Sequence, residues 1–484
     1  MTEASAMAGH ATSFETTPDG AARPAVTPST PGSAAASPRA ASLPTATLRE
    51  TVQVLADVIV PNVAKGVIIR RRRAKALIER FDLDRRGIRR VQQLHEKYGD
   101  GPLLFHLPIG PYALILAPNH VHRVLAGAPV PFTANNRAKR ASLARFEPLG
   151  VLLSDGPERA DRRRFNEAVL DTDLPIHRYC GRFLAVVEEE VSELIKDARR
   201  HGRLEWEPFT AAWARIVRRV VLGDGARDDL ELSRILDTLR SDGNWTFMRP
   251  MRKGLRRKFF ERLRRHAERA EPESLAGAMA SVPATSRTAP LQQIPQWLFA
   301  ADAAGVAMFR ALALLATHPE QAARFRRDAE AAQGPARALL PYARACVLDS
   351  LRLWPTTPLL LRDSVEPTTW TTSTGDNATL PAKTGVLIYA PYFHRDDRRL
   401  PYADRFEPEL WLEERTAEDW PLIPFSAGPS VCAGRNLVLL LTSATLTRLL
   451  DGRQIRLEGP RRVDPSRPLP ATIDHFTLRF ALDG

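Results

Sequence analysis

Hydrophobic positions recur at helical spacing over most of the chain and alternate with polar positions in a few short stretches. Leu103, Phe105 and Leu107 alternate ahead of a Pro-Ile-Gly-Pro turn, and an apolar run at 113–116 follows the turn. Residues 99–118 therefore predict a β-hairpin. Other strand-like pieces lie near 357–362, 379–390 and 473–482. We expect a mainly α domain with small β-sheets, the first of them towards its N-terminal side.

A helix is expected to begin at Thr47, because Thr47 and Glu50 have the spacing of a capping box. It continues into 52–69, an apolar stretch that polar residues and a proline interrupt too often for it to span a bilayer. Four arginines follow at 70–73. Two interpretations remain open: an amphipathic helix with a solvated basic end, or peripheral contact with an anionic membrane through 48–75.

The run 295–317 is apolar all round, begins with a proline suited to a first turn, and ends at a His-Pro pair. Such a helix either crosses a membrane or passes through the centre of a large protein. Asp302 and Arg310 lie within it, and each would be costly at the middle of a bilayer. A central buried helix is therefore the expected outcome.

The chain has 484 residues, of which 44% are hydrophobic and 26% charged, as in soluble globular proteins. Residues 1–46 are dominated by Ala, Ser, Thr and Pro without apolar periodicity, which predicts a disordered leader. This leader lacks the basic start and apolar centre of a secretory signal. We expect a basic, amphipathic helical segment over 47–90 and one large domain over 91–484.

The charge balance and the cysteine count narrow the classes of partner. Lys and Arg number 69 and Asp and Glu 56, a net charge of +13 that favours acidic proteins or anionic membranes. The arginines are dispersed and no zinc-finger or RNP-type motif accompanies them, so nucleic acid is not an expected partner. Three widely spaced cysteines argue against a disulfide framework and for a reducing, cytoplasmic compartment. They are Cys180, Cys346 and Cys432.

The most informative stretch, 424–436, reads PFSAGPSVCAGRN and leads into an apolar helix. Cys432 therefore lies at a helix N-terminus, where N–H groups and the helix dipole are expected to lower the thiol pKa. Gly428 and Gly434 permit tight turns and the close approach of a flat ligand, and Phe425 can pack against that ligand. A soft thiolate in a dry loop suits a haem iron, and an inert buried cysteine is the alternative.

The spacing Phe-x-x-Gly-x-x-x-Cys-x-Gly resembles the haem-binding signature of the cytochrome P-450 family, and other landmarks follow in that family's order. Segment 393–411 looks like the family's stretch ahead of the cysteine loop. Asp349 and Arg352 occupy the place of its Glu-x-x-Arg pair, whose i,i+3 spacing lets the charges meet. Leu410 stands where many members have an arginine, so this scaffold is expected to be weakened or to use Arg405 instead.

The resemblance implies a haem b cofactor, iron protoporphyrin IX, with Cys432 as the axial ligand of the iron. Arg362 matches a position that often pairs with a haem propionate. Arg159 and Arg163, at i,i+4 spacing, resemble the family's propionate clamp. Taken singly, each of these two could equally lie on an exposed basic helix. Ser430 replaces the usual Arg or His, and Arg159 is the expected compensator.

Aligning 295–317 with the central helix of the family places Asp302 at the acid position and Ala303 where a threonine usually lies. In an apolar groove, Asp302 is expected to have a raised pKa and to relay protons, with a purely structural acid as the alternative. Ala303 lacks the hydroxyl that helps to order the water that protonates bound oxygen. Ordinary hydroxylation is therefore in doubt.

The resemblance implies a stand-alone, bacterial-type haem domain acting as a monomeric monooxygenase on a small, largely apolar organic molecule. Electrons would come from a separate ferredoxin or flavoprotein, and stretches 125–150 and 243–270 are expected to contact substrate. Two alternatives remain open. Ala303 favours a peroxygenase-like or a coupling or cleavage oxidase. A haem-binding protein without turnover is favoured by the departures at Asp349, Leu410 and Ser430.

Overall fold

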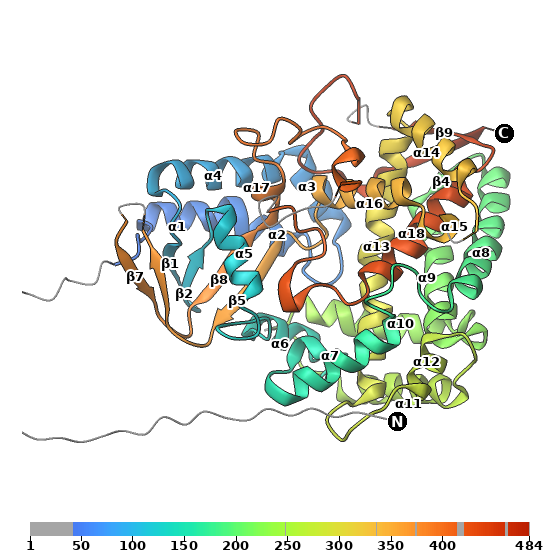
Figure 1. Ribbon diagram of the computed structural model, residues 1–484, viewed down its shortest axis with the longest axis horizontal. Coiled ribbons are helices and arrows are strands. Elements are labelled where there is room, and N and C mark those ends of the chain that lie inside the picture. The colour runs from blue at the N-terminus through green and yellow to red at the C-terminus, as the bar shows by residue number, and fades with distance from the viewer. Residues whose placement is uncertain are drawn as a thin grey trace, which may run out of the picture. The chain divides into compact units, whose positions relative to one another are not determined.

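The computed structural model describes residues 42–246, 248–334, 336–372, 375–413, 421–459 and 463–483. Residues 1–41, most of the expected leader, lie outside these ranges. The described residues belong to one unit of mutual contacts. In Figure 1 a sheet with N-terminal helices along it occupies one side and a helical region the other.

The main sheet has the strand order β1-β2-β8-β5-β3. β2 and β8 run parallel and the other neighbours antiparallel. Leu107 pairs with Gly110 at the turn between β1 and β2, so the predicted hairpin is confirmed. The five strands are β1 (Leu103–Leu107), β2 (Gly110–Leu114), β3 (Phe132–Thr133), β5 (Leu359–Ser364) and β8 (Gly385–Tyr389).

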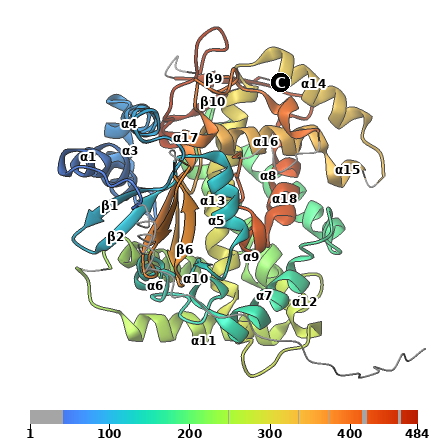
Figure 2. The ribbon, with the colours of Figure 1, turned by 60° about the vertical axis from the view of Figure 1, so that its left-hand side comes forward.

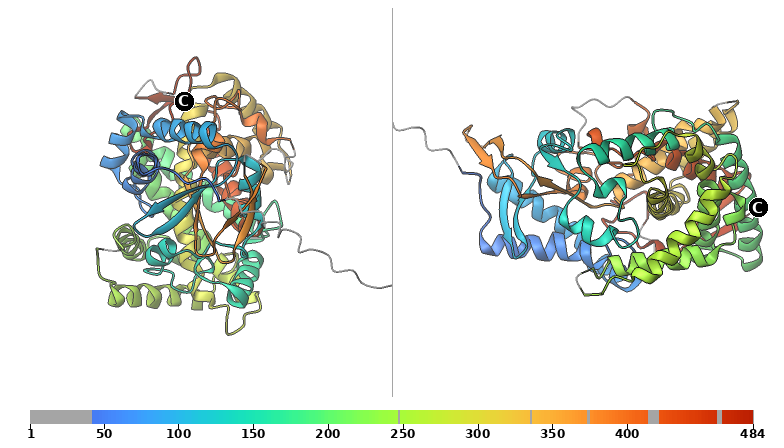
Figure 3. Two further views of the ribbon diagram at one scale, coloured as in Figure 1. Left: turned by 90° about the vertical axis from the view of Figure 1, so that its left-hand side faces the viewer. Right: turned by 90° about the horizontal axis from the view of Figure 1, so that it is seen from below.

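Apolar side chains of this sheet form a core with the N-terminal helices, which Figure 3 shows lying along it. Thr47 and Glu50 form the predicted capping box. The elements on this side are α1 (Leu48–Val54), a π-helical turn (Leu55–Ile59), α2 (Val60–Ala64), α3 (Arg72–Arg80), α4 (Leu83–Tyr98), α5 (Pro118–Ala126) and α17 (Ala390–His394). The helix α6 (Arg137–Leu143) follows β3 and contributes Leu143 to the core of the helical region.

A second core lies within the helical region, which Figure 2 shows around α13. Its helices are α7 (Gly156–Leu170), α8 (Cys180–His201), α9 (Trp206–Leu222), α10 (Leu230–Gly243), α11 (Lys253–Arg269), α12 (Leu275–Ser281), α13 (Ile294–Leu315), α14 (Pro319–Ala331), α15 (Ala336–Leu339), α16 (Pro341–Leu353) and α18 (Arg435–Leu450). The smaller strands are β4 (Leu204–Glu205), β9 (Gln454–Glu458) and β10 (Arg479–Asp483) in one sheet, with β6 (Thr368–Thr371) and β7 (Asn377–Leu380) in another. Short 3-10 turns lie at Val151–Leu153, Asp224–Ala226, Pro290–Gln292, Pro408–Trp411, Gly428–Ser430 and His475–Thr477.

The helix α13 confirms the expected central helix. It is long and apolar enough to cross a membrane by length and composition, yet 72% of its most apolar window is buried inside the fold. All its side chains from Ala304 to Leu315 are buried. It packs against α9, α16 and α18. A helix with apolar residues on every side is stable in water only when other elements surround it, as they do here.

The pair Asp349–Arg352 is fully buried in α16. Arg352 Nε lies 2.5 Å from Asp349 Oδ1, and Arg352 Nη2 lies 2.6 Å from the backbone oxygen of Arg405. Asp349 also accepts hydrogen bonds from the backbone N–H of Glu407 (2.8 Å) and the indole N–H of Trp411 (3.1 Å). A buried ion pair needs such additional partners, because each charge has lost its hydration.

The alternative in which Arg405 supplies the missing third charge is wrong. The Arg405 side chain is 63% exposed and lies 3.2 Å from Glu407, so only the backbone oxygen of Arg405 joins the buried network. Trp411 and the Glu407 backbone occupy the third place. A neutral indole donor satisfies the remaining carboxylate lone pair without a further buried charge.

Removal of the Asp349 carboxylate should destabilise the fold strongly. We expect Asp349→Ala to lower the free energy of unfolding by about 3–5 kcal/mol, because Arg352 would remain charged and buried without its partner. Denaturant unfolding measures this loss. Asp451→Ala is the matched control, since it removes an i,i+3 partner of Arg448 that is 70% exposed. The control should cost less than about 1 kcal/mol, and equal losses in both variants would contradict the prediction.

Candidate functional site

Cys432 lies in the loop ahead of α18, and its backbone N–H donates to the carbonyl oxygen of Phe425 at 3.0 Å. Gly428 adopts a φ of +63°, and a Cβ at this position would lie 2.3 Å from the backbone oxygen of Leu125 in α5. The turn predicted at Gly428 is therefore confirmed, and it is packed directly against α5. A Cβ on Gly434 would meet no atom within 4 Å, so the space beside this glycine is open.

Opposing influences act on the Cys432 thiol. Burial raises its pKa, whereas the backbone N–H of Gly434 and the charges of Arg163 and Arg435 lower it. Burial is the largest influence, so the expected net lowering of the pKa is wrong. The loop stabilises the thiolate with positive potential, but the loss of hydration destabilises the thiolate by more. Such a thiol becomes a stable thiolate when a metal ion takes up its charge.

Two arginines of α7 hold the cysteine loop. Arg159 donates to the Ser430 hydroxyl at 2.9 Å, so its guanidinium lies beside the residue that lacks the usual cation. Arg163 donates to the carbonyl oxygen of Val431 at 2.6 Å and pairs with Glu167 at 2.5 Å. The i,i+4 spacing therefore places both guanidiniums on the loop. Arg163 therefore uses its guanidinium on the backbone next to Cys432 and on Glu167 of its own helix.

Arg362 on β5 and Arg159 form a buried pair of cations. Arg362 is 3% exposed and Arg159 7% exposed. The Arg362 guanidinium donates to the oxygens of Leu361 (3.0 Å) and Ser426 (3.4 Å), while its buried Nε has no hydrogen-bond partner. Burial, and then the charge of Arg159, lowers the pKa of Arg362 to about 10.

Within the ranges that the structure describes, no carboxylate lies at ion-pair distance from either Arg159 or Arg362. Buried charges without partners are costly, so two of them side by side fit an anionic ligand. Two guanidiniums in particular suit a ligand with two carboxylates.

Asp302 lies in different surroundings from those expected. Its side chain is 56% exposed and forms an ion pair with Arg240 of α10, so the dry, apolar setting predicted for it is wrong. Arg240 is only 4% exposed, also binds Asp237 at 3.0 Å, and lies over the ring of Phe299. Ala303, the next residue of α13, is partly buried.

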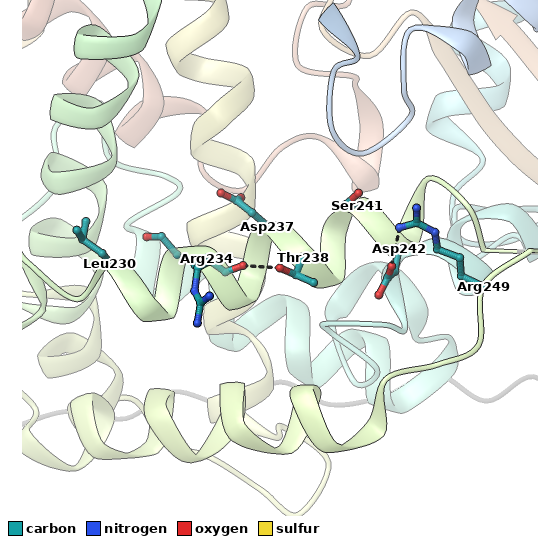
Figure 4. Close-up of a pocket in the computed structure, with 8 residues that line it drawn as sticks. Leu230, Arg234, Asp237, Thr238, Ser241, Asp242 and Arg249 are labelled. Carbon is teal, nitrogen blue, oxygen red and sulfur yellow. Dashed lines mark hydrogen bonds and ion pairs between the residues drawn. The ribbon is translucent and has the colours of Figure 1, made fainter.

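Arg240 was not foreseen from the sequence, because it lies 62 residues from Asp302 within a helix of mixed charge. Its i,i+3 spacing to Asp237 was the available signal. A pocket of about 510 Å³ runs along α10 and is lined by Asp237 but not by Arg240 or Asp302. In Figure 4 Asp237 and Ser241, which line it, point to the same side of α10. Burial and then the Asp302 charge raise the pKa of Asp237, against the lowering influence of Arg240.

The chain is similar to known proteins over the segments that carry these residues. The sequence model of the cytochrome P-450 family matches residues 294–471. This range runs from α13 through the Asp349–Arg352 pair to the cysteine loop and beyond. This stretch of the chain is similar to the cytochrome P-450 family. Within it, the chain is 34% identical over 142 residues to the cytochrome P-450 monooxygenase FCK2 of Fusarium pseudograminearum, a match that covers 29% of this chain and 25% of that protein.

Sugiol synthase of Salvia miltiorrhiza is 31% identical over 159 residues, which cover 30% of this chain and 31% of the synthase. The chain thus spans a quarter to a third of the length of these cytochrome P-450 relatives. Solved structures match over more of the chain. The cytochrome P-450 CYP102L1 has a TM-score of 0.69 at 16% identity and covers 92% of this chain and 100% of its own. The cyanobacterial CYP120A1, solved with retinoic acid, has a TM-score of 0.65 at 16% identity, covering 81% and 93%.

These structures confirm the predicted mainly α fold with small sheets. Cytochromes P-450 are haem-thiolate proteins in which a cysteine holds the haem. The residues of this chain fit that cofactor: Cys432 supplies a partly buried sulfur, and Arg159 and Arg362, which pair with no acid among the described residues, suit its two carboxylates. The described residues contain no cluster of three His, Cys, Asp or Glu side chains that could hold a bare metal ion. A single sulfur ligand is consistent with a metal carried in a cofactor.

Proposed function

We propose that this chain is a haem-thiolate monooxygenase that oxidises a small, largely apolar organic molecule with dioxygen, with Cys432 as the axial ligand of the iron. The observation that carries the proposal is the Cys432 loop, which is packed against α5 at Gly428 and contacts two buried arginines that pair with no acid among the described residues. The monooxygenase among the relatives supports the reaction type. Bound haem supplies the oxidation chemistry, and a thiolate ligand donates electron density to its iron.

The residues around Cys432 position this ligand. Arg163 fixes the carbonyl of Val431, one residue before the cysteine, and Arg159 fixes Ser430. Phe425, partly buried against the helical core, shields the sulfur side of the loop from water. Arg159 and Arg362 would bind the haem propionates, and the open space beside Gly434 would let a flat ring approach the loop.

Proton delivery falls to Asp302 in this proposal. Its carboxylate is accessible to water, and Arg240 holds it in place while remaining almost fully buried. A positioned carboxylate in contact with water can take up a proton and pass it on. Since Ala303 has no hydroxyl, the route runs from Asp302 through water, without a side-chain relay on the next residue.

The electron donor is a separate ferredoxin or flavoprotein in this proposal. Arg435 is exposed three residues after Cys432, and the net charge of +13 favours an acidic partner. A positive surface close to the axial ligand attracts such a partner and shortens the path for electrons.

Peripheral membrane contact through 48–75 is also proposed, since exposed apolar side chains gather in and next to this segment. Trp245, stacked on Arg71 at 4.3 Å, adjoins the segment, and Arg73 is exposed within it. Apolar groups beside cations suit an anionic bilayer surface. The exposed apolar residues are Leu48, Val52, Val60, Val63, Val67, Leu77 and Phe81.

The ligand assignment is tested by spectroscopy. The reduced protein with carbon monoxide should show the strongly red-shifted Soret band of thiolate ligation, and Cys432→Ala should abolish it, because no other sulfur lies in this loop. Cys180→Ala, at the start of α8, is the control and should retain the band. A red-shifted band that survives in Cys432→Ala would refute the proposed ligand.

The absent hydroxyl is tested by Ala303→Thr, with Ala303→Val as a control of the same shape. With dioxygen, a reductant and a ferredoxin, the fraction of electrons that ends in product should be higher in the Thr variant by about twofold or more, and less peroxide should be released. The reason is that a hydroxyl can order the water that delivers the proton. The Val variant should show no gain. Equal coupling in the three proteins would contradict the placement of Ala303.

The same assay separates a second candidate function that Ala303 favours, a peroxygenase-like oxidase. Turnover of the wild-type protein with peroxide but not with dioxygen and a donor would favour it. Bound haem without turnover under either condition would favour a haem carrier. Either result would refute the monooxygenase.

Membrane contact is tested by co-sedimentation with lipid vesicles. Binding to phosphatidylglycerol-containing vesicles should exceed binding to phosphatidylcholine vesicles, and the double change Val60→Asp and Val67→Asp should weaken it by about tenfold or more, because it removes apolar contact and adds negative charge. Leu230→Asp changes a side chain that is 69% exposed on α10 and serves as the control. Binding that is equal in both variants would argue against this surface.

A further inference from the structure

A second group of buried cations lies at the 3-10 turn His475–Thr477, against which α13 packs. Lys75 of α3 is 3% exposed and Arg310 of α13 is 5% exposed. The Arg310 guanidinium donates to the carbonyl oxygens of Trp354 at 2.9 Å and of Ile473 at 3.4 Å. Because Ile473 lies two residues before the turn, the second bond places the Arg310 guanidinium at the start of the turn.

The helix α3 contacts the same turn. The guanidinium of Arg72 lies 4.9 Å from the centre of the Phe476 ring, in the middle of the turn. Lys75 follows Arg72 by three residues, a spacing that puts both side chains on one side of the helix. Arg72 is exposed and Lys75 is buried, so Lys75 occupies the inner part of this contact between α3 and the turn.

Asp84 of α4 is an acid close to this segment, and its charge is already balanced. Its Oδ1 lies 2.5 Å from Lys65 Nζ, and its Oδ2 accepts a hydrogen bond from the hydroxyl of Thr472, three residues before the turn. Both charged side chains are buried. One base and one hydroxyl satisfy this carboxylate, so it leaves no negative charge over for Lys75 or Arg310.

Asp474 is the acid next to the turn itself. Its Oδ1 accepts the backbone N–H of Phe476 at 3.2 Å, whereas its Oδ2 is buried and has no hydrogen-bond partner among the described residues. Within the same part of the chain, neither Asp474 nor Glu79, one turn after Lys75 in α3, lies at ion-pair distance from Lys75 or Arg310. Both cations are therefore buried without an acid in contact, which is a costly arrangement.

Three polar groups at this place, on Lys75, Arg310 and His475, lack an acceptor. Within the described residues, the Lys75 ammonium forms no hydrogen bond or ion pair. Arg310 Nε and His475 Nδ1 are buried and have no hydrogen-bond partner there either. Burial, and then the charges of Lys75 and Arg310, lowers the pKa of His475 well below its ordinary value, so the ring is neutral and can carry its proton on Nδ1. An anion gives buried donors an acceptor and balances buried positive charge at once.

We propose that Lys75, Arg310 and His475 form a buried binding site for one compact monovalent anion, either a free halide or the carboxylate of a small organic acid. One negative charge is enough, because Asp474 supplies another beside the same turn. Arg310 lies seven residues after Ala303, about 10 Å further along α13, so this site is distinct from the one around Ala303. The inference depends neither on the cofactor nor on the reaction. Its consequence is that an ion from solution holds α3, α13 and the turn together.

The experiment follows thermal unfolding of the holoprotein by circular dichroism while sodium bromide or sodium acetate is raised from about 1 to about 200 mM. The ionic strength is held constant with the sodium salt of a bulky sulfonate buffer, whose anion is too large for a compact site. Lys75→Met keeps the length of the side chain and removes its charge. Lys196→Met, which changes an exposed lysine of α8, is the matched control.

The unfolding midpoint of the wild type and of Lys196→Met should rise saturably by about 2 °C or more with bromide, acetate or both, because a ligand of the folded state stabilises it. Lys75→Met should show no rise. In the sulfonate salt alone its midpoint should equal or exceed that of the wild type, since an apolar side chain replaces an unpaired charge. A rise with bromide alone identifies a free halide as the occupant, and a rise with acetate alone identifies a carboxylate. A wild type without a saturable rise in either salt would overturn the inference, and so would an equal rise in Lys75→Met.

A second measurement locates the anion without any variant. Crystals of the wild-type holoprotein are grown with the salt that raises the midpoint, and bromide is recognised by its anomalous scattering. Density beside Lys75 Nζ and the Arg310 guanidinium would support the site. Density that appears only elsewhere on the protein would overturn it.

Discussion

A buried ion pair between Asp349 and Arg352 fixes the chain that leads to the cysteine loop. Neither side chain is exposed, and the pair is satisfied because segment 403–411 brings backbone groups and one indole to it. The same contacts clamp this segment onto α16. The position of the segment ahead of Cys432 therefore depends on one carboxylate and one guanidinium, and a charge that loses its partner here has no water to replace it.

Around the cysteine the electrostatics differ, because two buried arginines, Arg159 and Arg362, pair with no acid among the described residues. Arg159 and Arg362 are nearly inaccessible, and burial raises the pKa of the Cys432 thiol in the loop that they contact. Both conditions are unfavourable in the protein alone, and both are relieved by a ligand that brings carboxylates and a metal ion. Such a ligand stabilises the folded state by its own binding free energy.

The features that could be predicted from the sequence depend on neighbours along the chain. The Thr47 capping box, the hairpin around Gly110 and the central helix α13 all follow from local spacing, which fixes helix starts, turns and apolar faces. The cysteine loop could be placed for the same reason. The Arg240–Asp302 pair could not, since it joins two helices that only the tertiary fold brings together. Nor could Trp411, which occupies the place of a charged residue, or the balance between burial and positive charge at Cys432.

The contact between Gly428 and α5 has a mechanical meaning. Because a single added methyl group would meet a backbone oxygen of α5 at 2.3 Å, the loop cannot move closer to α5 or accept a side chain there. The position of the sulfur is thus set by two parts of the chain at once: α18, which follows it, and α5, which lies about 300 residues earlier beside the sheet. A side chain at position 428 would require α5 or the loop to move, so the sulfur and α5 are mechanically coupled.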